Sequence, residues 1–199
     1  MKIGVFGGTF DPVHNGHIAL AKQALSECKL DSLIVVPANE QPFKSGTKTA
    51  PGEHRYNMLK LAFDNEDKVV ISDIELAKGD VSYTIDTLSE IKKLYNGAEI
   101  LFIIGIDAFL SIELWKNAEK LLSEYSFIVG SRPGYKESEL DEVILRLEKA
   151  YKTNVTRISN EQILVSSTGI KACMKTDCYQ GGNSPPGVER YITANGLYS

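Results

Sequence analysis

The sequence has little of several features that define other classes of protein. Its 22 basic side chains are nearly balanced by 26 acidic ones, and the net charge is -4. Such a balance gives no overall attraction to nucleic acid or to an anionic membrane. No apolar run approaches the length that spans a bilayer. Any phosphate binding must therefore depend on a local arrangement of residues.

Cysteine is also scarce. Cys28, Cys173 and Cys178 are an odd number in a chain of this size, which favours reduced thiols in the cytoplasm over a disulfide framework. Nothing near the last two completes a four-ligand metal site. The first residues read as a strand and not as a signal segment. We therefore expect a cytoplasmic protein, with residues 1–199 forming one domain around a sizeable core.

The two commonest glycine-rich phosphate motifs are missing as well. The glycines near the start do not have the G-x-G-x-x-G spacing, and no Gly-Lys-Ser/Thr follows them. Residues 7–17, GGTFDPVHNGH, stand instead between an apolar strand at 2–6 and an amphipathic helix that reaches Cys28. In a parallel α/β sheet such a strand-to-helix turn lies where ligands bind, and the helix N-terminus favours phosphate. Gly7 and Gly8 allow the backbone to approach a ligand closely.

Two imidazoles follow at the opening of this helix. His14 and His17 are three residues apart, a spacing that lets both contact one anion. The stretch resembles the G-[GS]-[TS]-F-D-P-x-H-x-G-H signature of the nucleotidyltransferase superfamily. That resemblance implies that both histidines are catalytic and hold the phosphates of ATP during attack on its α-phosphorus. It also places Gly7, Gly8, Thr9 and Phe10 at the ATP.

Strands and helices alternate along the rest of the chain. Apolar, β-branched runs predict strands at 2–6, 32–36, 69–71, 99–104, 126–130 and within 154–158. Helical spacing predicts helices after residue 17, at 53–63, from about 84 to 95, at 139–151 and at 188–195, and residues 166–171 read as the start of another. We expect a Rossmann-like three-layer α/β sandwich with a mostly parallel sheet and the site along its carboxyl edge.

Two later segments resemble nicotinate-nucleotide adenylyltransferases. The run at 82–88 matches S-Y-T-[IV]-D-T-L, which implies that Tyr83 and Thr84 contact a pyridine carboxylate, although capping alone would explain the threonine. Trp115 stands in a G-x-D-x(7)-W pattern, which implies stacking on the pyridine, whereas core packing is the default for a lone tryptophan. The backbone N–H of Lys116 would complete the carboxylate site. In the same pattern Gly105 allows close approach, and Asp107 suits sugar hydroxyls or Mg²⁺.

Other candidate residues follow further strands or open a helix. We expect Lys44, Arg132, Ser167, Thr168 and Lys171 to surround the ATP, the first with a catalytic role. Two of these segments depart from the family pattern. Phe43 replaces the histidine of a Pro-His-Lys run, and Lys171 replaces the arginine of I-S-S-T-x-[IL]-R, so that a point charge substitutes for a bidentate donor.

Some charged residues receive no functional role. His54 and Arg55 are read as a polar helix face, and Asp73, Glu75 and Asp80 as solvated.

The resemblance implies transfer of AMP from ATP to nicotinate mononucleotide, with Mg²⁺ bridging phosphate oxygens. Because the acceptor's own phosphate attacks, no protein nucleophile is required. Two alternatives stay open: the same chemistry on nicotinamide mononucleotide or phosphopantetheine, and a nucleotide-binding sensor without turnover. Class I aminoacyl-tRNA synthetases also carry an H-x-G-H turn, but this chain is short and has no K-M-S-K-S-like loop. We expect small-molecule partners, no nucleic acid and no membrane, and the residues leave a homo-oligomer possible.

Overall fold

The computed structural model describes residues 1–40, 49–131, 137–159, 165–176 and 181–198. Within these ranges six strands form one parallel sheet in the order β3-β2-β1-β4-β5-β6. The strands are β1 (Lys2–Gly8), β2 (Ser32–Pro37), β3 (Val69–Ile71), β4 (Glu99–Gly105), β5 (Ser126–Ser131) and β6 (Val155–Ser159). All six positions predicted from the sequence are confirmed.

The order of the strands determines where a ligand can bind. The chain builds outward from β1 through β2 to β3, then returns to place β4 on the other side of β1. In open α/β sheets the crevice at such a reversal, beyond the carboxyl ends of the strands, is the usual ligand site. Here that crevice lies between Gly8, which ends β1, and Gly105, which ends β4.

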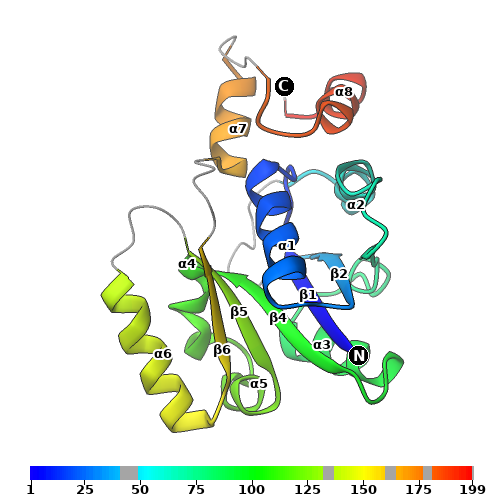
Figure 1. The fold of residues 1–199 in the computed structure, drawn as a ribbon. Helices are drawn as coiled ribbons and strands as arrows, with labels where there is room; N and C mark the ends of the chain where they lie inside the picture. Colours follow the sequence, from blue (N-terminus) through cyan, green and yellow to red (C-terminus); the bar gives the residue numbers. More distant parts are fainter. Residues whose placement is uncertain (41–48, 132–136, 160–164, 177–180, 199) are drawn as a thin grey trace.

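Helices cover both faces of the sheet (Figure 1). They are α1 (Asn15–Glu27), α2 (Gly52–Ala62), α3 (Thr84–Leu94), α4 (Ile106–Phe109), the 3₁₀ turn η2 (Ile112–Leu114), α5 (Ala118–Glu124), α6 (Glu137–Tyr151), α7 (Ser167–Met174) and α8 (Pro186–Ala194). Successive side chains of a strand point to opposite faces, so β4 supplies Ile100, Phe102 and Ile104 to one core and Leu101 and Ile103 to the other. The first core packs against α3 to α6, and the second against α1, α2 and α8.

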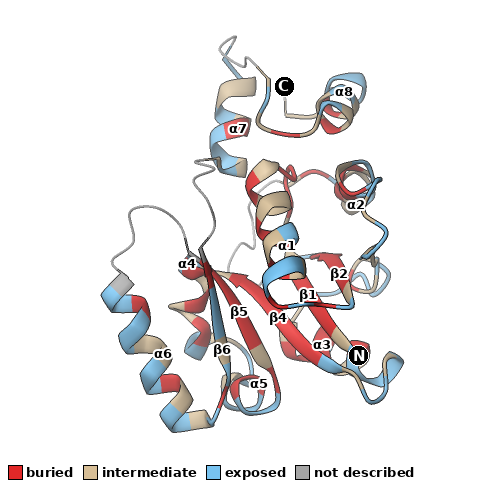
Figure 2. Ribbon diagram, viewed as in Figure 1, coloured by how far each residue is buried: buried red, intermediate tan, exposed pale blue. Residues whose placement is uncertain are grey.

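The fold class predicted from the sequence is confirmed. The central strands are buried on both faces (Figure 2), as continuous apolar runs predict for parallel strands. The short helices α4, η2 and α5 were not predicted, since each has few residues in which to show a period. Helix ends differ by one or two residues; for example, α6 begins at Glu137 and not at Glu139. In the described ranges no helix is both long and apolar enough to cross a bilayer.

Candidate active site

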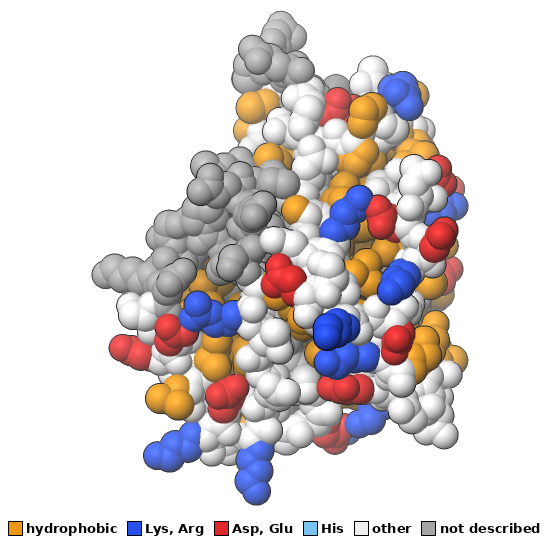
Figure 3. All heavy atoms as spheres, viewed as in Figure 1, with side chains coloured by type: hydrophobic (Ala, Val, Ile, Leu, Met, Phe, Trp, Pro, Cys, Tyr) orange, Lys and Arg blue, Asp and Glu red, His pale blue; other side chains and the backbone are white. Residues whose placement is uncertain are grey.

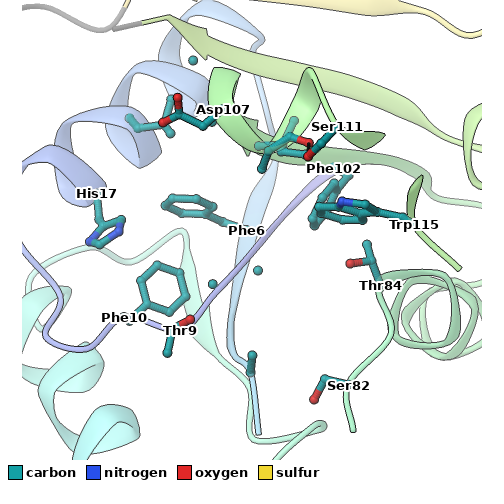
Figure 4. A pocket seen from close by; sticks show the side chains of 18 of the residues that line it. Phe6, Thr9, Phe10, His17, Ser82, Thr84, Phe102, Asp107, Ser111 and Trp115 are labelled. Carbon is teal, nitrogen blue, oxygen red and sulfur yellow. Dashed lines mark hydrogen bonds between the residues drawn. The ribbon is translucent and has the colours of Figure 1, made fainter. Parts of the chain in front are cut away.

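A cavity of about 930 Å³ opens at the strand reversal. Its lining comes from the ends of β1 and β4, the starts of α1 and α3, and the turn around η2. Figure 4 shows His17, Phe6 and Phe10 toward one side of it and Trp115, Phe102 and Thr84 toward the other. The cavity therefore has two ends, which we call the histidine end and the aromatic end.

The two histidines form the N-terminal cap of α1. Backbone N–H of His17 donates to Nδ1 of His14, and backbone N–H of His14 donates to Nδ1 of His17, both at 3.3 Å. Such a reciprocal pair is a capping box built from imidazoles. The rings stack with centroids 3.6 Å apart and an interplanar angle of 20°. Because each Nδ1 accepts a hydrogen bond, each neutral ring carries its proton on Nε2.

Aromatic rings hold His17 in place. Phe10 meets its ring edge-on at 5.0 Å between centroids, and Phe6 lies 6.1 Å away. Phe10 has φ 49°, a left-handed conformation that is costly for a residue with a side chain. Its ring is buried. Packing of the phenyl ring therefore fixes the backbone of the turn that carries the histidines.

Asp11 is the centre of a buried polar cluster behind the histidine turn. Only 3% exposed, its carboxylate accepts hydrogen bonds from backbone N–H of Ala50 at 3.0 Å and from the hydroxyl of Tyr198 at 2.6 Å. Lys171 forms an ion pair with it at 2.7 Å. Burial, followed by the hydrogen bond to Asp11, raises the pKa of Tyr198, so its hydroxyl stays a donor. Parts of the chain 160 and more residues apart thus meet at one carboxylate.

Residues from the C-terminal part of the chain also hydrogen-bond to the backbone of the histidine turn. Ser167 donates to the carbonyl of Pro12 at 2.9 Å, and buried Ser184 donates to that of Val13 at 2.7 Å. Backbone N–H of Asn15 donates to the carbonyl of Asn183 at 2.9 Å. In Figure 1 α7 and α8 accordingly lie beside the beginning of α1.

Arg55 is buried, which corrects its assignment to a polar helix face. It is 2% exposed, and its guanidinium donates to the carbonyls of Thr9 at 3.0 Å, Ala38 at 2.6 Å and Ala50 at 2.9 Å. Desolvation lowers the pKa of Arg55, and the charge of Asp11 opposes this. A residue outside the cavity therefore fixes the turns after β1 and β2. By contrast, His54 is half-buried and contacts the hydroxyl of Tyr191 at 3.0 Å.

At the aromatic end the N-terminus of α3 faces the cavity. Tyr83 occupies the N-cap position and Thr84 the first helical position, so capping does not explain Thr84. The first N–H groups of a helix seek an acceptor, and the helix dipole favours an anion there. Lys116 lies over the Tyr83 ring at 3.9 Å and pairs with Asp86 at 3.1 Å. The half-buried ring of Trp115 meets Phe102 edge-on at 6.2 Å.

Glu75 is likewise not solvated as expected. It is 8% exposed, lines the cavity and accepts a hydrogen bond from Thr87 at 2.6 Å. Burial raises the pKa of its carboxyl, against hydrogen bonds from Thr87 and Ser82. Its immediate neighbours in the sequence, Ile74 and Leu76, are apolar, and this was the available signal of its burial.

The structure brings most of the sequence candidates together. The lining includes Gly7, Gly8, Thr9, Phe10, His14, His17, Tyr83, Thr84, Gly105, Asp107, Trp115 and Lys116. It does not include Ser167, Thr168 or Lys171, of which the first and last contact the histidine turn instead. Lys44 and Arg132 lie outside the described residues.

Several lining residues were not singled out from the sequence, among them Phe6, Ser82, Phe102, Ile104 and Gly130. Ser82 belongs to the matched S-Y-T run, and Phe102, Ile104 and Gly130 lie near the ends of predicted strands, which was the available signal. Among the described lining residues Lys116 is the single Lys or Arg. Among these residues the histidine end offers imidazole rings and a helix N-terminus as donors. The face in Figure 3 shows Lys and Arg interspersed with Asp and Glu, with no continuous basic surface.

An α/β sheet with a helix-capping histidine pair at its strand reversal defines a nucleotide-binding protein of the Rossmann-like class. The family model described as cytidylyltransferase-like matches residues 5–172. A protein named "Probable nicotinate-nucleotide adenylyltransferase" from Thermoanaerobacter sp. is 37% identical, covering 100% of this chain and 94% of its own. One of the same name from Clostridium acetobutylicum is 36% identical, with 99% and 98% covered.

Solved structures show the same fold. Plasmodium falciparum nicotinic acid mononucleotide adenylyltransferase complexed with NaAD has a TM-score of 0.80, 22% identity and coverage of 99% of this chain and 97% of that one. The same enzyme complexed with APC gives a TM-score of 0.77. The chain belongs to the cytidylyltransferase-like family, within its nicotinate-nucleotide adenylyltransferase group.

Proposed function

We propose that the protein transfers AMP from ATP to nicotinate mononucleotide. The observation that carries the proposal is one cavity joining two kinds of binding group. Paired imidazoles on a helix N-terminus suit phosphate, while a second helix N-terminus beside a tryptophan suits a flat ring with a carboxylate. The relatives' names agree with this combination.

The reaction needs positioning and no protein nucleophile. A phosphate oxygen of the mononucleotide attacks the α-phosphorus of ATP, a new P–O bond forms, and the bond to the bridging oxygen breaks to release pyrophosphate. Nε2–H of each imidazole in the capping pair is a donor for the phosphate oxygens, on which charge builds. Because both rings are fixed by the backbone of α1, they need little reorganisation during the reaction.

The predicted ATP ligands divide between contact and support. Gly7, Gly8 and Thr9 let the β1 turn approach the nucleotide, and Asp107 is an exposed carboxylate suited to the ribose hydroxyls. Ser167 and Lys171 contact the histidine turn, which supports a role in holding it, and with Thr168 they remain proposed ATP ligands. Lys44 and Arg132 remain proposed cationic ligands. A pyridine would stack on Trp115, with its carboxylate at Tyr83, Thr84 and the backbone N–H of Lys116.

Mg²⁺ is proposed to enter with ATP. No cluster of three His, Cys, Asp or Glu that could hold a metal occurs in the described ranges. Asp107, as the exposed carboxylate of the cavity, fits one further ligand to a cation that the phosphates hold. Such an ion neutralises charge on the leaving pyrophosphate. We propose a cytoplasmic location, because thiols stay reduced there and the buried thiol of Cys28 is free.

The test is pyrophosphate release from ATP, with nicotinate mononucleotide, nicotinamide mononucleotide and phosphopantetheine as acceptors. We expect release with nicotinate mononucleotide, less with the amide and none with phosphopantetheine. Preference for another acceptor would refute the assigned substrate. ATP binding by calorimetry without pyrophosphate release on any acceptor would identify a nucleotide sensor.

A further inference from the structure

Glu75 has no part in the reaction as proposed, yet it is the buried carboxyl of the cavity. It follows β3, on the connection that leads to α3, and lines the aromatic end. Buried carboxyls are uncommon because desolvation disfavours their charge. Its position therefore calls for a role.

Two hydroxyls converge on this carboxyl. Thr87 in the first turns of α3 donates to Oε1 at 2.6 Å, and Ser82 donates from the segment before the helix. These two residues bracket Tyr83 and Thr84, the N-cap and first residue of α3. The Glu75 side chain thus accepts hydrogen bonds from one residue before and one residue after the pair that faces the cavity.

Further hydrogen bonds join Ser82 to the segment that follows β2. Oγ of Ser82 accepts a hydrogen bond from backbone N–H of Asn39 at 3.1 Å, and backbone N–H of Ser82 donates to the carbonyl of Glu40 at 2.9 Å. Residues 39 and 40 lie two and three residues after Pro37, which ends β2. Through Ser82, Glu75 is therefore connected to the carboxyl edge of the sheet, where the histidine end also begins.

We propose that Glu75 is a positioning residue that selects the acid over the amide form of the pyridine mononucleotide, by fixing the N-terminus of α3 toward the acceptor's carboxylate. The inference rests on the proposed function. A helix N-terminus favours a carboxylate over a neutral amide only when its N–H groups point at it. Removing the Glu75 carboxyl takes away the acceptor shared by the Ser82 and Thr87 hydroxyls, so the helix N-terminus is held less firmly and the acid loses its advantage.

The charge of Glu75 is compatible with this role. Its burial raises the pKa of the carboxyl, which lessens repulsion of a neighbouring substrate carboxylate. The charged groups that act on it are Lys78 on its own connection and Arg55 on α2, and both favour ionisation.

The test compares steady-state constants of the full chain with both pyridine acceptors. For Glu75→Ala we expect the KM for nicotinate mononucleotide to rise about tenfold, as for a lost buried hydrogen-bond partner, while the KM for ATP changes less than about twofold. The ratio of kcat/KM for acid to that for amide should fall by a similar factor. Thr87→Val should reproduce part of this effect, and Glu75→Gln should restore the KM because its amide oxygen still accepts.

The control is Thr193→Val on α8, which also loses a helix hydroxyl but one bonded to the carbonyl of Glu189, outside the cavity. It should leave all constants unchanged. An unchanged acid-to-amide ratio of kcat/KM in Glu75→Ala would overturn the inference while the proposed function stands. So would an equal rise in the KM for nicotinate mononucleotide and the KM for ATP. A wild-type chain that releases no pyrophosphate with nicotinate mononucleotide would overturn both.

Discussion

The two ends of the cavity are assembled differently. The histidine end depends on contacts between distant parts of the chain, since Asp11 meets Lys171 and Tyr198, and Val13 meets Ser184. The aromatic end draws on residues 75–87 and 115–116, and its contacts span shorter separations: Thr87 and Glu75 are 12 residues apart, and Lys116 and Asp86 are 30 residues apart. The histidine end therefore joins the first and last parts of the chain, whereas the aromatic end is held by contacts within the middle of the chain and to the end of β2.

This difference suggests a division of tasks. A histidine turn held rigidly by contacts from several elements suits the end where phosphorus is attacked, because preorganised donors lower the barrier only if they are already in place. An end that shares no contact with the last part of the chain can change its acceptor with few substitutions and leave the reaction intact. Variants at the two ends should therefore separate catalysis from acceptor choice.

The largest expected effect is the loss of an imidazole at the histidine end. His17→Ala removes one preorganised donor and should lower kcat by about a hundredfold or more. The matched control is His54→Ala, since this histidine contacts Tyr191 and does not line the cavity. Pyrophosphate release measures both. A His17 variant with the wild-type rate would remove the histidine end from the chemistry.

A smaller effect tests the buried polar cluster around Asp11, behind the histidine turn. Lys171→Met leaves the buried carboxylate of Asp11 without its cation, and the free energy of unfolding should fall by about 2 kcal/mol. Lys171→Arg should recover most of this loss. Lys22→Met breaks an exposed ion pair with Glu66 and should cost less than about 1 kcal/mol. Urea denaturation measures all three. Equal losses of unfolding free energy for Lys171→Met and Lys22→Met would mean that the buried Lys171–Asp11 pair adds no more stability than an exposed pair.

The same contrast explains which features the sequence predicted. Strands, the α1 turn and the residues at both ends of the cavity carry local signals: apolar runs, glycines and short motifs. Lys171 reads as a phosphate ligand because a cation follows three residues with hydroxyl groups. Its pairing with Asp11 depends on how α7 packs across the histidine turn, which no local pattern contains.

Arg55 and Glu75 were missed for a related reason. Charged residues in polar segments are mostly solvated, and their burial here depends on partners from several elements. The carbonyls that receive Arg55 come from the turns after β1 and β2 and from Ala50. Only the assembled sheet brings those acceptors together.

At the aromatic end the expected effect on binding is more modest. Trp115→Ala removes the ring proposed to stack on the pyridine, and the KM for nicotinate mononucleotide should rise about tenfold, the upper range for an aromatic pair. The KM for ATP should stay near that of the wild type, and Trp115→Phe should retain most of the affinity. If Trp115→Ala raised the KM for ATP instead, the two ends would not divide the substrates as proposed.

The smallest effect concerns pH and the buried carboxyl of Glu75. Because burial raises its pKa above the ordinary value of 4.5, the folded state binds this proton more tightly than the unfolded state. Its contribution to stability is complete below pH 4.5 and is lost as pH rises through the folded-state pKa. Glu75→Gln does not titrate, so the wild type should lose stability relative to this variant over that window. Urea unfolding at stepped pH measures the difference. If the free energy of unfolding changed with pH equally in the wild type and Glu75→Gln, ionising the buried carboxyl would not destabilise the fold.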